Sequence, residues 1–218
     1  EKRLTLPSTK LPSSRKHGLS LWMEGMETTY TELAHDFITT ENCPMRIGVD
    51  ASIWFYAIMV ALRKLALNAQ RGPNPKLTTM LYKFCHLLSL PFSLVISIDG
   101  PQRAPFKHGK KVLNPPYWLL DSFCCLTEIF KHKIHQAPGD AEAELAVLNQ
   151  CGLIDAVLME DSDAFVYSAL TVIQSYALWN PDTIAVYCLQ DIMYNLVFPI
   201  MPSGLLMLAT LGGSDQSI

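Results

Sequence analysis

The sequence predicts an α/β protein with a mainly parallel central sheet, because short apolar strands alternate with helical segments along most of the chain. The clearest strand is "FSLVISI" at residues 92–98. Apolar runs of the same kind occupy residues 45–49 and 154–159. Because these runs are separated by helical patterns and not by tight turns, we expect neighbouring strands to be parallel.

The helices are predicted from apolar side chains that recur every three or four residues. Residues 77–90 show this spacing most clearly, at Leu77, Met80, Leu81, Phe84, Leu87 and Leu88. The other expected helices are residues 52–67, 117–131, 140–150 and 203–211, with a weaker helical pattern over 19–44. The remaining expected strands are residues 133–136 and 183–189.

Composition limits the class of protein. The 218 residues are 50% hydrophobic and 17% charged, which is typical of a globular domain and long enough for one large core. The longest apolar runs are too short to span a membrane, and residues 1–20 do not have the pattern of a signal peptide. The six cysteines form no C-x-x-C pair, which argues against a zinc site or a disulfide framework. We therefore expect a soluble intracellular protein.

The first residues differ in composition from the rest. Residues 1–18 are rich in Pro, Ser and Lys, so we expect a mobile basic arm followed by a folded core at 19–218. The chain does not begin with Met, which suggests a fragment or a trimmed product. Its net charge of −3 does not exclude a nucleic-acid partner, since many of the acids belong to a few short motifs.

Those acids follow the predicted strands or stand next to helix ends. Because the carboxyl ends of parallel strands share one edge of a sheet, acids far apart in the sequence are expected to converge there. A single Asp after a strand is usually a helix cap or a turn residue, and Asp140 is well placed to begin a helix. The acids expected at the edge are Asp50, Asp99, Asp140, Glu142, Asp161, Asp163 and Asp215.

So many carboxylates in one place repel each other and oppose folding unless cations bind between them. An oxygen-only donor set favours Mg²⁺ or Mn²⁺ over zinc, and a pair of such ions can promote phosphodiester hydrolysis. Glu144 is expected to be a solvated or supporting carboxylate and not a ligand. His132 and His135 are expected to be polar surface residues.

A basic segment at residues 100–112 follows Asp99 and contains no acid. Its cations could hold the phosphates of a nucleic acid beside the metal site, although a solvated loop is the alternative. The nearby "PPYW" at residues 115–118 is expected to pack in the core. The sequence has no P-loop and no dinucleotide-binding fingerprint, so no nucleotide cofactor is expected. The basic residues concerned are Arg103, Lys107, Lys110 and Lys111.

Four blocks, in order, resemble the flap endonuclease/XPG family of structure-specific nucleases. They are "RIGVDASIWFYA" (46–57), "SIDGPQRAPFKHGKKV" (97–112), "HQAPGDAEAELAVLNQCGLIDAVLMEDSDAFVYSA" (135–169) and "LATLGGSD" (208–215). The residues of these blocks are most similar to those of the Holliday-junction resolvase branch, in a fungal-like form. The resemblance implies a three-layer α/β/α core of the PIN-like type, a two-metal nuclease that acts on branched or junction DNA, and a nuclear location.

By the same resemblance, all seven acids match metal-site positions, and Asp140 stands where the family usually has Glu. Lys107 matches a basic residue that the family places near the scissile phosphate. This sequence departs from the family in lacking its Met-Gly start, in a short segment between Lys111 and Tyr117, and in ending before the helix–two-turn–helix segment. These departures leave open an alternative, a diverged or truncated paralogue that binds DNA or protein without cutting. No oligomeric state is predicted.

Overall fold

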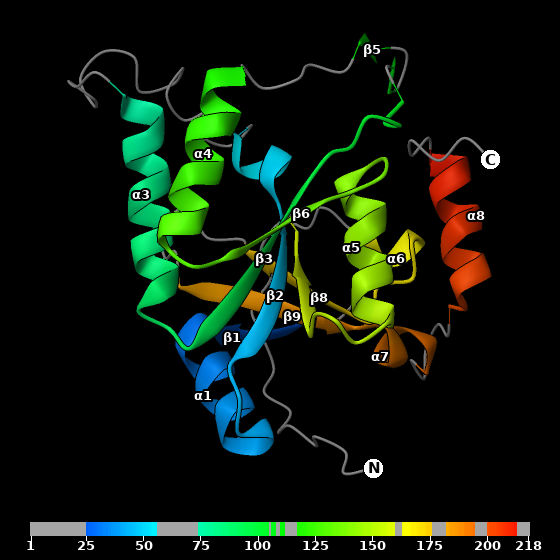
Figure 1. The fold of residues 1–218 in the computed structure, drawn as a ribbon. Helices are drawn as coiled ribbons and strands as arrows, with labels where there is room; N and C mark the ends of the chain where they lie inside the picture. The colour runs from blue at the N-terminus through cyan, green and yellow to red at the C-terminus, as the bar shows by residue number, and fades with distance from the viewer. Residues whose placement is uncertain are drawn as a thin grey trace, which may run out of the picture.

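A computed structural model describes residues 25–55, 74–104, 106–107, 110–111, 117–159, 163–175, 182–194 and 200–212. Within these ranges the fold is built on a seven-stranded sheet with the order β1-β9-β8-β7-β2-β3-β6 (Figure 1). The strands are β1 (Met26–Thr29), β2 (Met45–Asp50), β3 (Phe92–Ile98), β6 (Lys133–Gln136), β7 (Ala156–Leu158), β8 (Thr171–Ser175) and β9 (Thr183–Cys188). Two further strands, β4 (Phe106–Lys107) and β5 (Lys110–Lys111), form a separate antiparallel pair.

The sheet is mainly parallel, as predicted. Strands β8, β7, β2, β3 and β6 pair in parallel, whereas β9 is antiparallel to both β8 and β1. From β2 the chain passes to β3 and β6 on one side, and then returns to β7 on the other side of β2. This reversal places a topological switch point at the carboxyl end of β2, where open α/β sheets form ligand sites.

Helices cover both faces of the sheet (Figure 1). They are α1 (Tyr30–Glu41), α3 (Pro75–Leu88), α4 (Tyr117–Ile129), α5 (Ala141–Gln150), α6 (Asp163–Val166), α7 (Leu189–Met193) and α8 (Pro202–Gly212), together with the helical residues 51–55. None of these described helices has both the length and the apolar character required to cross a bilayer.

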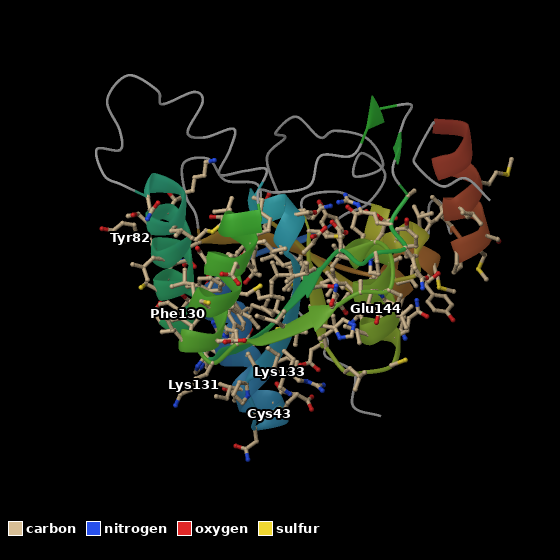
Figure 2. All side chains as sticks on the ribbon, turned by 45° about the horizontal axis from the view of Figure 1, so that its top comes forward. Cys43, Tyr82, Phe130, Lys131, Lys133 and Glu144 are labelled. Atoms are coloured by element: carbon tan, nitrogen blue, oxygen red, sulfur yellow. The ribbon has the colours of Figure 1, made fainter. Side chains whose placement is uncertain are left out.

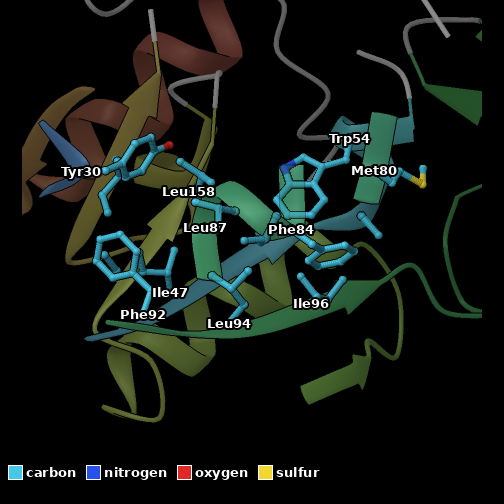
Figure 3. Packing of buried hydrophobic residues seen from close by; sticks show 14 of the residues in the cluster. Tyr30, Ile47, Trp54, Met80, Phe84, Leu87, Phe92, Leu94, Ile96 and Leu158 are labelled. Atoms are coloured by element: carbon cyan, nitrogen blue, oxygen red, sulfur yellow. The ribbon is translucent and has the colours of Figure 1, made fainter. Parts of the chain in front are cut away.

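One core lies between the sheet and α1, α3 and α4. Phe84 and Phe123 are fully buried in it, and Trp54 packs edge-on against both rings (Figure 3). A second core lies on the other face, where Leu145 of α5 and Phe165 of α6 pack with β7, β8 and β9. Gly48 on β2 allows this close contact, because a Cβ there would collide with Ile154 and Leu145. The three-layer α/β/α architecture is therefore confirmed.

Strands 92–98 and 133–136 match the prediction residue for residue, but the start of the core differs. The segment 19–44 was expected to be weakly helical. Instead Met26–Thr29 form edge strand β1, and α1 begins only after Thr29, whose side chain and that of Glu32 form a reciprocal capping box. Strand β8 was not predicted, because its "TVIQS" sequence is short and half polar.

Two further expectations need adjustment. The last strand ends at Cys188, one residue earlier than expected, and Leu189 begins α7. Of the helix expected at 52–67, the structure describes only residues up to 55, which are helical. The basic arm expected at residues 1–18 lies outside the described residues.

Candidate functional site

The site begins with Asp50, the last residue of β2 and the most buried of the described acids. Its side chain faces α5 from the centre of the sheet and is only 1% exposed. Ser52 secures both oxygens: its backbone N–H donates to Oδ1 at 2.7 Å, and its hydroxyl donates to Oδ2 at 2.9 Å. Asp50 therefore caps the helical residues 51–55 while it also faces the carboxyl edge.

The loops that follow β3 and β6 are joined by backbone hydrogen bonds. Gly100 donates to the carbonyl of Gly139 at 2.7 Å, and Gln102 donates to that of Pro138 at 3.0 Å. Gly100 is required at this close approach, because a Cβ there would collide with the carbonyl oxygens of Ala137 and Pro138. This contact between the two loops places the residues on either side of it, Asp99 and Asp140, next to each other.

Arg103 lies between these two acids. Its Nη1 is 2.6 Å from Asp99 Oδ2, and its Nε is 3.2 Å from Asp140 Oδ1. The three side chains are about equally protected, with 17%, 17% and 22% of the surface of Arg103, Asp99 and Asp140 exposed. One guanidinium thus links two acids that are far apart in the sequence.

Asp99 also caps α5, although it lies outside that helix. Its Oδ1 accepts a hydrogen bond from the backbone N–H of Ala141 at 3.0 Å. Asp140 has the backbone position of the N-cap but makes no capping bond with its side chain. Asp140 was expected to begin this helix, and its backbone does so. The side-chain oxygen that caps the helix comes from Asp99 instead.

The surroundings of Asp50 disfavour its charged form. Burial and the negative charge of Asp99 together raise the pKa of Asp50 to about 6, against the lowering effects of the Ser52 hydrogen bonds and of Arg103. Arg103 pairs with Asp99 and Asp140 and also lowers the pKa of Asp50, against the effects of burial and of Asp99.

Two more acids follow Asp140 on α5. Glu142 and Glu144 both lie in the first turn of the helix. Glu144 Oε1 is 2.7 Å from His135 Nε2 on β6, and Figure 2 shows Glu144 on the α5 side of the sheet. Glu144 is therefore paired rather than freely solvated.

The histidines are less exposed than predicted. His135 is half-buried beside Glu144. His132 is also half-buried, its ring stacks on Phe84 with the centroids 5.6 Å apart, and burial lowers its pKa. Neither is an ordinary surface residue, because Phe84 of α3 covers His132 and Glu144 of the following helix pairs with His135.

The remaining predicted site residues are described only in part. Lys107, Lys110 and Lys111 lie in β4 and β5, and only their backbone is described. Asp163 begins α6, again with only its backbone described, and Asp161 and Asp215 lie outside the described residues.

Among the side chains that the structure describes, no group of three His, Cys, Asp or Glu residues is arranged to hold a metal ion. The donor chemistry nevertheless suits a hard cation, since Asp50, Asp99 and Asp140 present oxygens alone. Sequence reasoning missed two contributors, the bonds from Ser52 to Asp50 and the pairing of Arg103 with the acids. The first was detectable in "DAS", because an Asp two residues before a Ser at a helix start is a capping pattern.

Comparisons with known proteins match parts of this chain. Residues 131–215, less than half of the chain, match the XPG I-region. "Flap endonuclease GEN homolog 1" of Mus musculus is 37% identical over an alignment of 161 positions, which covers 62% of this chain and 16% of that protein. A crystal structure of the Holliday junction-resolving enzyme GEN1 with product DNA, Mg²⁺ and Mn²⁺ ions superposes with a TM-score of 0.71 at 27% identity, covering 87% of this chain and 43% of that one. Residues 131–215 thus resemble the XPG I-region, and the fold resembles that of the GEN1 enzyme.

The extent of the match limits what can be transferred from these relatives. "Flap endonuclease GEN" of Drosophila pseudoobscura pseudoobscura is 46% identical, but over only 43 residues, 20% of this chain and 6% of that protein. The chain thus spans between 6% and 16% of the length of these curated relatives. The matched I-region begins at β6 and contains Asp140, Glu142 and the start of α6, so it includes the α5 half of the site.

Proposed function

We propose that this chain is the core of a Mg²⁺-dependent, structure-specific DNA endonuclease that hydrolyses phosphodiesters at branched, flap or Holliday-type junctions. The observation that supports this most is the convergence of Asp50, Asp99 and Asp140 at the carboxyl edge, at the topological switch point. In a chain that resembles the XPG I-region, this arrangement fits a divalent-cation site better than a structural role. A substrate of this kind implies work in the nucleus.

The chain's own residues would divide the work as follows. Asp50, Asp99 and Glu142, with Asp161 and Asp163, are the proposed ligands of two Mg²⁺ ions, for which Mn²⁺ can substitute, and Asp140 and Asp215 support them. When bound, the ions supply an activated water and charge stabilisation at the phosphate. Lys107 would stabilise charge on the scissile phosphate, and Lys110 and Lys111 would hold neighbouring phosphates of the strand, whereas Arg103, first expected to do the same, is paired with Asp99 and Asp140.

The test is cleavage of labelled flap, nicked and four-way DNA in Mg²⁺ or in EDTA. Glu142→Gln and Asp161→Asn should each lower the rate by more than about a thousandfold, equivalent to about 4 kcal/mol of transition-state stabilisation. Both variants should keep the wild-type circular dichroism spectrum, because neither change removes buried apolar surface.

Glu144→Gln is the matched control, since Glu144 lies two residues after Glu142 in the same helical turn and pairs with His135. Its cleavage rate should stay within about threefold of wild type. Cleavage by Glu142→Gln at the wild-type rate would remove Glu142 from the proposed site.

A second candidate function is a non-catalytic paralogue that binds DNA or protein. It is favoured by one observation, that Arg103 already occupies oxygens of Asp99 and Asp140. A chain that binds four-way DNA but does not cut it in Mg²⁺ or Mn²⁺ would establish this alternative.

A further inference from the structure

We propose that Arg103 is a built-in counter-ion of the carboxylate edge, which a divalent cation must displace from Asp99 and Asp140 in order to bind. The identity of that cation rests on the proposed function, but the geometry of Arg103 does not. Arg103 is thus a positioning residue, which keeps the two acids in place while no metal is present.

The contacts are those of a guanidinium shared by two carboxylates. Nη1 lies 2.6 Å from Asp99 Oδ2, and Nε lies 3.2 Å from Asp140 Oδ1. The other oxygen of Asp99 accepts the Ala141 N–H at 3.0 Å, so both oxygens of Asp99 are occupied. A cation bound directly to Asp99 Oδ2 would lie close to the positive charge of Nη1, so charge repulsion favours movement of the guanidinium away from it.

The loop contact makes this arrangement specific. Arg103 donates its own backbone N–H to the carbonyl of Gly100 at 3.3 Å, in the turn that Gly100 joins to the loop after β6. Its side chain is only 17% exposed, so it does not sample solvent as a surface arginine does. The turn therefore directs the guanidinium into the gap between Asp99 and Asp140.

Competition predicts an effect of unusual sign. A bound divalent cation and the guanidinium repel each other and use the same oxygen, so each should weaken the binding of the other. Removing Arg103 should therefore tighten cation binding while it destabilises the metal-free chain. If Arg103 served only to hold the site together, its removal would weaken cation binding.

The experiment is calorimetric titration of the whole 218-residue chain with Mn²⁺ in metal-free buffer. Arg103→Gln should bind Mn²⁺ about tenfold more tightly than wild type, within the range of typical coupling between two sites. Arg103→Lys keeps the charge without the planar fork and should give an intermediate affinity. The rise in Tm on adding Mn²⁺ should follow the same order, because binding to the folded state stabilises it.

Arg46→Gln is the matched control, since Arg46 pairs with Asp155 at the same 2.6 Å distance but at the opposite edge of the sheet. Its Mn²⁺ affinity should equal that of wild type. An unchanged or weaker affinity in Arg103→Gln would overturn the proposal. If that variant does not fold without metal, Arg103→Lys decides by the same criterion.

Cleavage assays on the same samples separate this proposal from the proposed function. Tighter Mn²⁺ binding by Arg103→Gln in a chain that cuts no DNA supports the counter-ion role and contradicts the nuclease. If the wild-type chain cuts DNA in a metal-dependent manner but its Mn²⁺ affinity does not depend on Arg103, the result supports the nuclease and contradicts the counter-ion role. Failure of both wild type and Arg103→Gln to bind Mn²⁺ overturns the counter-ion role.

Discussion

The two ends of the central strands each have an arginine bound to aspartate, but only one end has a balanced pair of one arginine with one aspartate. At the amino end, Arg46 binds Asp155 alone, through Nη2–Oδ1 at 2.6 Å, Nε–Oδ2 at 3.0 Å and its backbone N–H at 2.7 Å. At the carboxyl end, Arg103 is shared by Asp99 and Asp140 and also acts on buried Asp50.

The difference distinguishes a structural contact from a site prepared for a ligand. A one-to-one bidentate pair satisfies both partners and joins β2 to the turn before β7. At the carboxyl end, burial and the charge of Asp99 raise the pKa of Asp50, so its charged form reduces the stability of the folded chain unless a cation binds. The following predictions test this contrast.

The largest expected effect is a loss of cleavage when an aspartate charge is removed at the carboxyl end, compared with the same change at the amino end. Asp99→Asn should lower Mg²⁺-dependent cleavage of branched DNA by more than about a thousandfold, or about 4 kcal/mol, because it removes a proposed ligand. Asp155→Asn should leave the rate per folded molecule unchanged. Gel assays of the two variants at equal folded concentration provide the measurement, and equal losses in both would contradict the distinction between the two ends.

The next effect concerns Asp50 and the pH dependence of stability in EDTA. A carboxyl group with a raised pKa stabilises the folded chain below about pH 4, and this contribution is lost as the pH rises through about 6. A shift of about two units corresponds to about 3 kcal/mol. The free energy of unfolding of Asp50→Asn relative to wild type should therefore increase by about 3 kcal/mol between pH 4 and pH 7.

Urea denaturation at several pH values measures this difference, and Asp155→Asn is a suitable comparison at the balanced end. A difference between Asp50→Asn and wild type that stays constant from pH 4 to pH 7 would mean that Asp50 is not under electrostatic strain.

The smallest effect is expected at the balanced pair itself. Arg46 is 43% exposed, so solvent screens its interaction with Asp155, and Arg46→Gln should cost only about 1 kcal/mol of unfolding free energy. The cost should shrink in 1 M salt, where exposed charges are screened over a few ångströms. Thermal or urea denaturation at low and high salt measures it, and a loss independent of salt would point to packing of the arginine stem instead.

Much of this fold was accessible from local patterns. Residues 92–98 and 133–136 were predicted to the residue, because a strand buried on both faces gives a continuous apolar run and the short strand beside it is bounded by clear breaks. Strands β1 and β8 were missed, since "METT" and "TVIQS" become strands only by pairing with β9. The acids after the strands were found for the same local reason, whereas their roles as metal ligands remain predictions.

The sequence by itself determined the alternation of strands and helices, the acids that follow the strands, and the excess of negative charge among them. Only the tertiary structure decided which groups neutralise those acids. Arg103 reaches Asp140 because backbone hydrogen bonds join the Gly100 turn to the loop at Pro138, and Glu144 of α5 reaches His135 of β6 across the turn between these two elements. Such pairings depend on how the chain turns in three dimensions, while periodicity and capping depend on neighbouring residues alone.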